Sequence, residues 1–239
     1  IPYAKNIPQK AKDTQIFKYP TVERNNLIYA WYHPNGEQPH YDVEHYPEIL
    51  DPDWGDEFEK YNYEIKCHIQ DMAENAVDAA HFMYVHGVVS YPEFEVSYEG
   101  HKRHFSQEAN METPRGIVKG KISGSSNGPG DSMTKFEGIC DTLLLGSTTP
   151  TENEEVITRF SFLQKKVDGV VPTGGVGSAI IADINKQVNE DIPVWENKKY
   201  AHKPVLCDSD GPIAKFRKHY ATFYVDYDES KEIEALNLD

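Results

Sequence analysis

Apolar residues recur at steps of three and four along the segment that begins at Ile69, which is the spacing of a helix with one buried side. Polar residues recur at the same period on a second stripe. The apolar stripe comprises Ile69, Met72, Ala73, Ala76, Val77 and Ala80, and the polar stripe comprises Asp71, Glu74, Asn75, Asp78 and His81. This pattern predicts one amphipathic helix that ends near Gly87, since glycine commonly follows a helix C-terminus.

A second helical pattern occupies residues 174–200. Its apolar face comprises Ile180, Ile181, Ile184 and Val188. Continuing this period places Asp191 and Trp195 on the face that should be buried. A buried carboxylate without a partner costs several kcal/mol, so Asp191 needs a metal ion or another cation beside it. Glu190 projects about 100° away from that face and is more easily solvated.

The remaining chain alternates short apolar runs with turn formers, which predicts an antiparallel sheet. Strands are expected at 27–32, 94–98, 116–122, 136–145 and 156–162, with turns at 33–36, 123–132 and 149–151. Residues 37–57, rich in proline and acidic side chains, are expected to form a linker, and 213–224 a last segment. An antiparallel sheet embraced by helices is an α+β fold.

The size and charge of the chain restrict the classes of protein and of binding partner that are possible. A length of 239 residues suits one sizeable domain with an appendage. The formal charge of −15 opposes binding to nucleic acid or to an anionic membrane. No apolar run approaches the ~18 residues that a membrane span needs, and no signal-like segment opens the chain. A cytoplasmic location is expected.

The cysteines are Cys67, Cys140 and Cys207, an odd number at wide spacing. They suit buried free thiols better than a disulfide framework. The sequence contains no Cys-x-His or Cys-x-x-His pair, so it lacks the two cysteines and two histidines that hold a Rieske [2Fe–2S] cluster.

The candidate chemistry lies between residues 74 and 86. His81 and His86 lie about 140° apart on an ideal helix, with Asp78 projecting between them, so both can bind one ion only if the last helical turn loosens. The alternative is a helix whose two histidines are merely hydrogen-bonded.

The pattern E-N-x-x-D-x-x-H-x-x-x-x-H over residues 74–86 resembles the mononuclear iron motif of the Rieske non-haem iron oxygenases. The resemblance implies Fe(II) bound by two histidines and one carboxylate, with one face open to dioxygen. By this resemblance His81 and His86 are the imidazole ligands. The stretch 190–195 resembles the segment of the third ligand, which implies Asp191, with Glu190 as the alternative. Asp78 and Asn75 are then catalytic positions, Asp78 orienting a ligand histidine and passing electrons.

The beginning of the chain resembles the segment after the second cysteine pair in this family. The resemblance implies that residues 1–40 are the last strands of a Rieske domain whose cluster-bearing part lies upstream. Residues 41–239 would then form the catalytic iron domain, with a helix-grip fold similar to START-type lipid carriers. The alternative is a complete protein that dispensed with the cluster.

Within the family, the chain most resembles the oxygenase components of 3-ketosteroid 9α-hydroxylases. This implies a monooxygenase that inserts one oxygen atom into a steroid C–H bond, with electrons from NADH through a ferredoxin-type reductase, and a homotrimer in which one subunit's cluster feeds the next subunit's iron. Six apolar or aromatic residues could line a pocket near the iron, and each could equally be an ordinary core residue. They are Phe82, Tyr84, Val85, Val89, Phe94 and Trp195. The rival functions are a sterol desaturase, an aromatic O-demethylase and a metal-free lipid-binding module.

Overall fold

The computed structural model describes residues 3–13, 18–33, 35–87, 95–113, 116–152, 154–207 and 210–226. It divides the chain into two compact units, Ile1–His45 and Tyr46–Asp239. Over the described ranges, none of the helices is both long and apolar enough to cross a membrane.

The first unit contains a short helix, α1 (Gln9–Asp13), and a hairpin of β1 (Thr21–Arg24) and β2 (Leu27–Ala30). The strand predicted at 27–32 corresponds to β2, whereas β1 was not predicted. Asn25 and Asn26 form the two-residue loop and have φ angles of 56° and 57°. Positive φ at both positions defines a type I′ turn, whose twist matches that of the paired strands, and asparagine tolerates it well.

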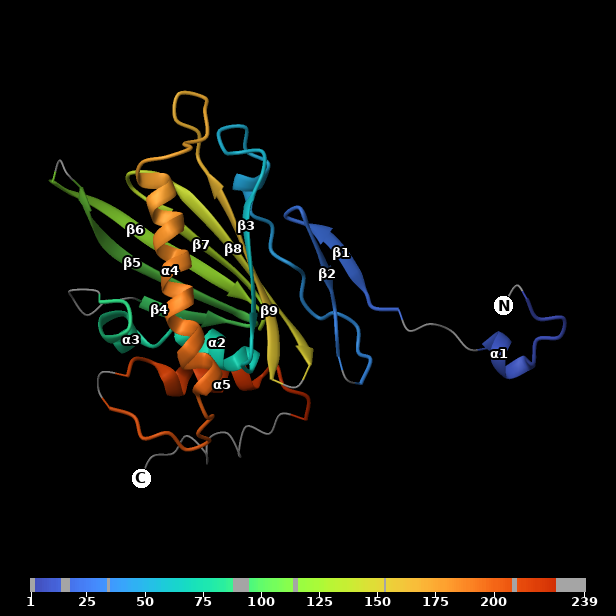
Figure 1. Ribbon diagram of the computed structural model, residues 1–239. Helices are drawn as coiled ribbons and strands as arrows, with labels where there is room; N and C mark the ends of the chain where they lie inside the picture. Colours follow the sequence, from blue (N-terminus) through green and yellow to red (C-terminus); the bar gives the residue numbers. More distant parts are fainter. Residues whose placement is uncertain are drawn as a thin grey trace. The chain divides into compact units, whose positions relative to one another are not determined.

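The second unit is built on an antiparallel sheet of seven strands in the order β3-β9-β8-β7-β6-β5-β4 (Figure 1). The strands are β3 (Glu59–Ile65), β4 (Glu95–Glu99), β5 (Lys102–Thr113), β6 (Gly116–Asn127), β7 (Asp131–Glu137), β8 (Thr142–Glu152) and β9 (Glu155–Gln164). A single 3₁₀ turn, η1 (Pro47–Ile49), lies in the predicted linker. The predicted α+β class and antiparallel sheet are confirmed.

Several predicted strand boundaries were wrong. The turn expected at 123–132 is confined to 128–130, the run 136–145 contains the end of β7 and the start of β8, and β8 continues through the expected turn at 149–151. β3 and β5 were missed. β3 was missed although Tyr61, Tyr63 and Ile65 alternate with polar residues, because the run is short and two of the three are tyrosines. The sequence of β5, KRHFSQEANMET, is dominated by polar side chains and shows little hydrophobic alternation.

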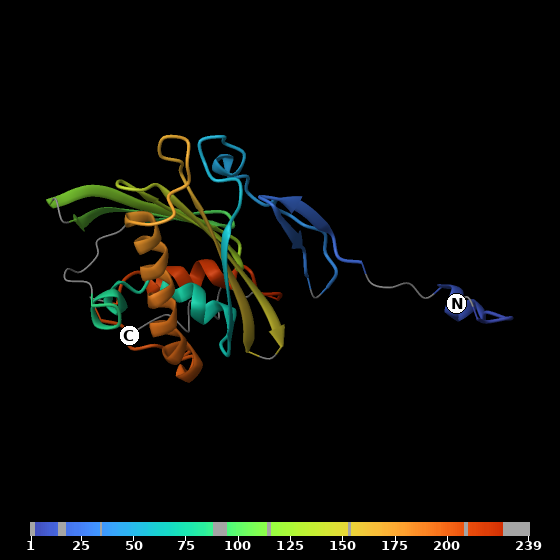
Figure 2. The same ribbon diagram turned by 45° about the horizontal axis from the view of Figure 1, so that its top comes forward.

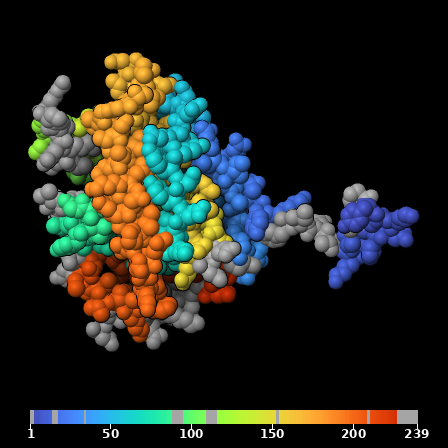
Figure 3. All heavy atoms as spheres, viewed as in Figure 1, coloured from blue at the N-terminus to red at the C-terminus, as the bar shows by residue number. Residues whose placement is uncertain are grey.

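Four helices lie on the same side of this sheet (Figures 1 and 2). They are α2 (Ile69–Asn75), α3 (Ala79–Tyr84), α4 (Val176–Asn197) and α5 (Ile213–Ala221). The helix predicted between residues 174 and 200 is confirmed as α4. On the surface α4 runs beside β3 (Figure 3), where the Tyr63 hydroxyl donates a hydrogen bond to the Asn185 side-chain oxygen.

The apolar face of α4 builds much of the core. Val188 and Trp195 pack with Ile65, Cys67 and Val156. Ile181, two turns earlier, packs against Leu144 and Phe162 of the sheet. Trp195 is therefore a core residue at the sheet edge. Cys67 and Cys140 are buried free thiols, as predicted, but Cys207 is exposed, because it lies in an irregular segment rather than in the core.

The single helix predicted from Ile69 to Gly87 is wrong, since the segment forms two helices. α2 ends at Asn75, and Asp78 begins α3 from an extended conformation, with φ −85° and ψ 93°. The Asp78 carboxylate accepts a hydrogen bond from the backbone N–H of His81 at 3.3 Å. This N-cap explains the break, because a short acidic side chain competes with the helix for backbone N–H groups.

The predicted polar stripe contains a buried ion-pair network. Glu74 accepts two hydrogen bonds from the Arg217 guanidinium, at 2.6 and 3.0 Å, and one from Lys198 Nζ at 3.1 Å. Lys198 also pairs with Asp71 at 3.0 Å. Arg217 stacks over Tyr200 and donates to the Ala201 carbonyl. The network ties α2 to α5 and to the chain that follows α4.

We predict that Glu74→Gln destabilises the protein by about 3 kcal/mol at neutral pH, because it leaves Arg217 buried without its counter-charge. Glu64→Gln, on the exposed side of β3, should change stability by less than about 0.5 kcal/mol. Urea unfolding followed by circular dichroism measures both.

The pH dependence of this difference checks the cause. Burial raises the pKa of Glu74, but the hydrogen bond from Arg217 and the charge of Lys198 outweigh it, so the pKa lies below its ordinary value. A depressed folded-state pKa adds stability above the unfolded pKa of about 4.3, and this stability is lost as pH falls through the folded pKa. The gap between wild type and Glu74→Gln should therefore be constant near neutrality and narrow in acid. A gap independent of pH would contradict the ionic explanation.

Candidate metal centre

His81, His86 and Asp191 come together between α3 and α4. One potential ligand atom from each lies within 4.8 Å of the others. His81 is on α3, His86 follows it, and Asp191 is in the C-terminal half of α4. The predicted third carboxylate therefore lies beside the two predicted histidines, although it is more than a hundred residues away in the sequence.

The His81 ring is held with one nitrogen free for a ligand. Its Nδ1 forms a hydrogen bond with the backbone carbonyl of Asp78, so this nitrogen carries the proton. Its Nε2 is buried and has no hydrogen-bond partner. Burial lowers the pKa of His81, which favours the neutral ring. A buried acceptor nitrogen without a hydrogen-bond donor is energetically unfavourable, and a metal ion bound to its lone pair would remove this cost.

The His86 ring contacts one carboxylate on each side. Its Nε2 lies 3.2 Å from Asp191 Oδ1, and its Nδ1 lies 3.0 Å from Glu190 Oε2. The His81 and His86 rings lie 5.1 Å apart, nearly perpendicular at 81°. α3 ends at Tyr84, so His86 lies outside the helix. The end of the helix removes the 140° separation that an uninterrupted helix would impose.

Asp191 is the buried carboxylate that the helical period predicted. It is 6% exposed. Its Oδ2 accepts a hydrogen bond from the Asn75 side chain at 3.1 Å. Burial raises the pKa of Asp191, and the two histidines and Asn75 offset part of this rise. Asn75 therefore positions the carboxylate while its other oxygen faces His86.

The donor set fits a first-row divalent metal. Two imidazole nitrogens and one carboxylate oxygen form the facial arrangement that holds non-haem Fe(II) and leaves other positions open. The orphaned Nε2 of His81, buried beside the donor atoms of His86 and Asp191, indicates that a cation belongs here.

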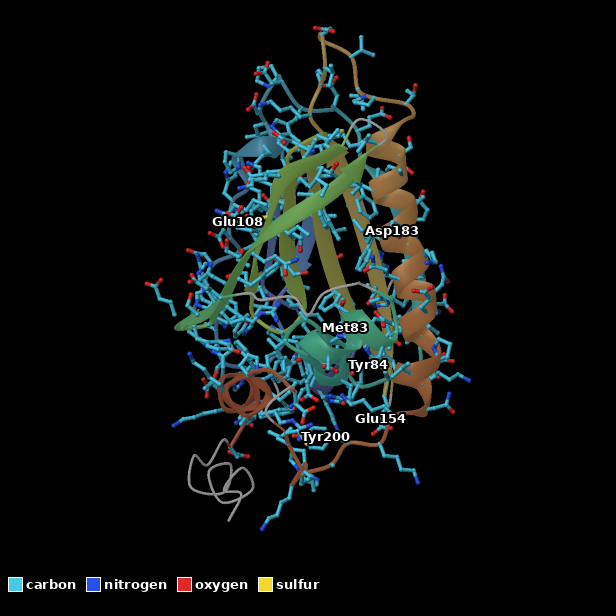
Figure 4. All side chains as sticks on the ribbon, turned by 90° about the vertical axis from the view of Figure 1, so that its left-hand side faces the viewer. Met83, Tyr84, Glu108, Glu154, Asp183 and Tyr200 are labelled. Atoms are coloured by element: carbon cyan, nitrogen blue, oxygen red, sulfur yellow. The ribbon has the colours of Figure 1, made fainter. Side chains whose placement is uncertain are left out.

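The predicted pocket residues differ in their placement. Phe82 lies 4.0 Å from the His81 ring and 5.9 Å from the His86 ring, between ring centroids. Val85 is half-buried beside them. Tyr84 ends α3 on the outer side, and its side chain is 84% exposed (Figure 4). Val89 and Phe94 lie outside the described residues.

A hollow of about 430 Å³ lies at the other end of α4. Its lining includes Cys140, Val170, Val176 and Gly177. Gly177 is about 20 Å along the helix from Asp191, at 1.5 Å per residue. This hollow contains none of the predicted pocket residues and is separate from the candidate metal centre.

Comparison with known families decides the class of protein. Residues 30–224 match the family model described as the 3-ketosteroid 9alpha-hydroxylase C-terminal domain. The chain belongs to that family. It is the catalytic domain of a Rieske non-haem iron oxygenase, and the family uses mononuclear iron. The resemblance inferred from residues 74–86 is confirmed.

Two relatives of this oxygenase domain are about equally similar to it. The oxygenase component of 3-ketosteroid-9-alpha-monooxygenase from Rhodococcus rhodochrous is 29% identical over 254 residues, covering 97% of this chain and 63% of that protein. Cholesterol 7-desaturase from Caenorhabditis elegans is 29% identical over 261 residues, covering 95% of this chain and 58% of the relative. The chain therefore spans about 60% of the length of these relatives.

Solved structures confirm the fold of the domain. The Pseudomonas putida CBB5 protein NdmA with caffeine aligns with a TM-score of 0.67 at 16% identity, covering 97% of this chain and 69% of that chain. Dicamba monooxygenase bound to dicamba aligns with a TM-score of 0.62 at 17% identity, covering 91% and 70%. At this identity the likeness concerns the arrangement of helices and strands alone.

Sequence reasoning missed the partner of His86 Nδ1. Glu190 was expected to be solvated, and its side chain is indeed 32% exposed, yet it reaches the imidazole. It also pairs with Lys186 at 3.3 Å, one turn earlier on α4. The Lys186–Glu190 spacing was visible in the sequence, but it indicates only a helical surface pair.

We predict that the protein binds one Fe(II) through His81, His86 and Asp191, and that His81→Ala or Asp191→Asn lowers bound iron to well below one per chain. Each change removes one of the three ligands. Anaerobic equilibrium dialysis with metal analysis measures the stoichiometry. Asp183→Asn is the matched control, since Asp183 (labelled in Figure 4) lies on the same helix, about two turns before Asp191, and accepts a hydrogen bond from the Gln187 side chain. Stoichiometric iron in His81→Ala would refute the ligand assignment.

Proposed function

We propose that the protein is the oxygenase component of a Rieske monooxygenase that hydroxylates a 3-ketosteroid at the 9α position. The observation that supports this most is the convergence of His81, His86 and Asp191 in a chain matched by the 3-ketosteroid 9alpha-hydroxylase model. Bound ferrous iron would supply the activation of dioxygen, with electrons ultimately from NADH.

The residues of the chain hold this centre in a defined geometry. His81 and His86 would hold the metal through Nε2, and Asp191 would hold it through a carboxylate oxygen. Asn75 fixes Asp191 through its amide, and the Asp78 carbonyl fixes the His81 ring. Second-layer contacts of this kind hold each ligand in one orientation and tautomer before the metal arrives. Phe82 shields one side of both rings with an apolar surface.

The proposed electron transfer requires a [2Fe–2S] Rieske cluster, which we propose accepts electrons from an NADH-dependent ferredoxin-type reductase. No Cys-x-His or Cys-x-x-His pair of this sequence could hold such a cluster, so its ligands would come from outside residues 1–239. We propose that residues 1–40 are the last strands of the Rieske domain and residues 41–239 the catalytic domain, of the helix-grip type. A homotrimeric ring, in which one subunit's cluster serves the next subunit's iron, completes the proposal.

A sterol desaturase is the second candidate. The Caenorhabditis elegans cholesterol 7-desaturase matches at the same 29% identity as the Rhodococcus rhodochrous monooxygenase component. Both are named for steroid substrates, which favours a steroid over a small aromatic ring. The two reactions differ in outcome, because hydroxylation adds one oxygen atom and desaturation removes two hydrogen atoms.

We predict that the full-length protein with reductase and NADH adds one oxygen atom to a 3-ketosteroid, and that mass spectrometry of a panel containing 3-ketosteroids, cholesterol and aromatic ethers detects it. The product mass distinguishes the rivals directly. Loss of two hydrogens from cholesterol would establish the desaturase, and loss of a methyl group from an ether the demethylase. Steroid binding by a protein that takes up no iron would support the lipid-binding module instead.

We predict that Asp78→Asn retains iron but loses most NADH-coupled turnover. Asparagine caps a helix about as well as aspartate, so α3 and the orientation of His81 should persist. The carboxylate charge that is proposed to link the cluster to the iron is lost. Iron content and turnover measured on the same preparation separate the two effects. Turnover near the wild-type rate would reduce Asp78 to a helix cap.

A further inference from the structure

Glu190 lies at the edge of the metal centre, where neither the family match nor the ligand set gives it a role. Its Oε2 atom lies 3.0 Å from His86 Nδ1, and His86 Nε2 faces Asp191 at 3.2 Å. The two nitrogens are on different sides of the imidazole ring. Glu190 therefore contacts His86 on the side away from the three converging ligand atoms.

This contact favours a proton on Nδ1 of His86. A carboxylate only accepts hydrogen bonds, so Nδ1 carries the hydrogen of the Glu190 contact. Nε2 faces the Asp191 carboxylate in the same way, and a metal ion bound there would take the place of a hydrogen on Nε2. The neutral ring then has its lone pair on Nε2, the atom beside Asp191. Histidine ligands usually donate their second N–H to a carboxylate or carbonyl, which fixes the ring and raises its basicity. His81 uses the Asp78 carbonyl in this way.

Glu190 also makes a contact on its solvent side. Its second oxygen, Oε1, pairs with Lys186 Nζ at 3.3 Å on the preceding turn of α4. The His86 side chain is only 2% exposed, whereas the Glu190 side chain is 32% exposed. Glu190 is thus the outermost member of a chain of contacts that runs from solvent, through a buried imidazole, to the centre.

We propose that Glu190 is a positioning residue, which orients His86 and sets its tautomer for metal binding, rather than a metal ligand. The inference rests on the proposed function, because it assumes that His86 binds the metal. It assigns adjacent residues of one helical turn to different tasks: Asp191 contacts the metal and Glu190 contacts a ligand of the metal.

Cobalt(II) is a suitable probe, because its visible absorption reports binding and its paramagnetism shifts the signals of coordinated histidines. In the wild type we expect two solvent-exchangeable imidazole N–H resonances, one each from His81 and His86. Glu190→Ala should abolish one by rapid exchange with water and weaken cobalt binding by about 10- to 100-fold. Glu190→Gln, which keeps an acceptor oxygen, should restore the resonance and most of the affinity.

Two variants on the same helix serve as controls. Lys186→Met removes the outer ion pair and should change affinity by less than about twofold, since exposed pairs contribute little. Asp183→Ala removes a similar negative charge far from His86 and should leave both resonances intact. Circular dichroism checks that α4 persists in Glu190→Ala, as expected for a good helix former at a partly exposed site.

The outcomes separate this inference from the proposed function. A wild type that fails to bind cobalt would overturn the metal centre itself. A wild type with both resonances, together with a Glu190→Ala variant that keeps both and binds equally well, would overturn only the role of Glu190. Loss of affinity in Glu190→Gln as large as in Glu190→Ala, with the resonance also missing, would show that Glu190 does not act as a hydrogen-bond acceptor.

Discussion

The position of the candidate metal centre depends on the buried carboxylate of Glu74. Arg217 and Lys198 hold it from α5 and from the chain after α4, so α2 is anchored at its C-terminal turn. Asn75, the next residue, projects about 100° away and reaches Asp191 on α4. One helical turn therefore connects the structural network to the metal centre. Because the charges are buried, shifting α2 would separate them in a medium that screens poorly, which makes the arrangement stiff.

Residue chemistry and helical period nominated three candidate ligands that the structure places together. Asp191 was nominated because a carboxylate on the apolar face of a helix needs a cation beside it. His81 and His86 were nominated because the pattern over residues 74–86 resembles the iron motif of one enzyme class. Their shared location was confirmed by the structure, and the family by comparison. The loosening of the last helical turn that brings His86 to the site was expected, but the helix end was placed near Gly87 rather than at Tyr84, because side-chain patterns locate helix ends poorly.

The parts that were missed depend on contacts between distant residues. β5 owes its strand conformation to pairing with β4 and β6 rather than to a hydrophobic pattern of its own. Arg217 looked like any arginine on an amphipathic helix, and its partner Glu74 lies 143 residues earlier. Glu190 was judged by its helical face alone. A long side chain at the border of two faces can reach inward, which a helical projection does not capture.

The strand order has a consequence for how the protein acquires its shape during synthesis. β3, at one edge of the sheet, pairs only with β9 among the seven strands, and Asn75 meets a residue 116 positions later. Contacts so distant in sequence close large loops, which makes folding slow compared with that of locally connected proteins. A nascent chain that has emerged only as far as β9 carries both histidines but not Asp191. The three candidate ligands can therefore come together only after all seven strands of the sheet have been synthesised.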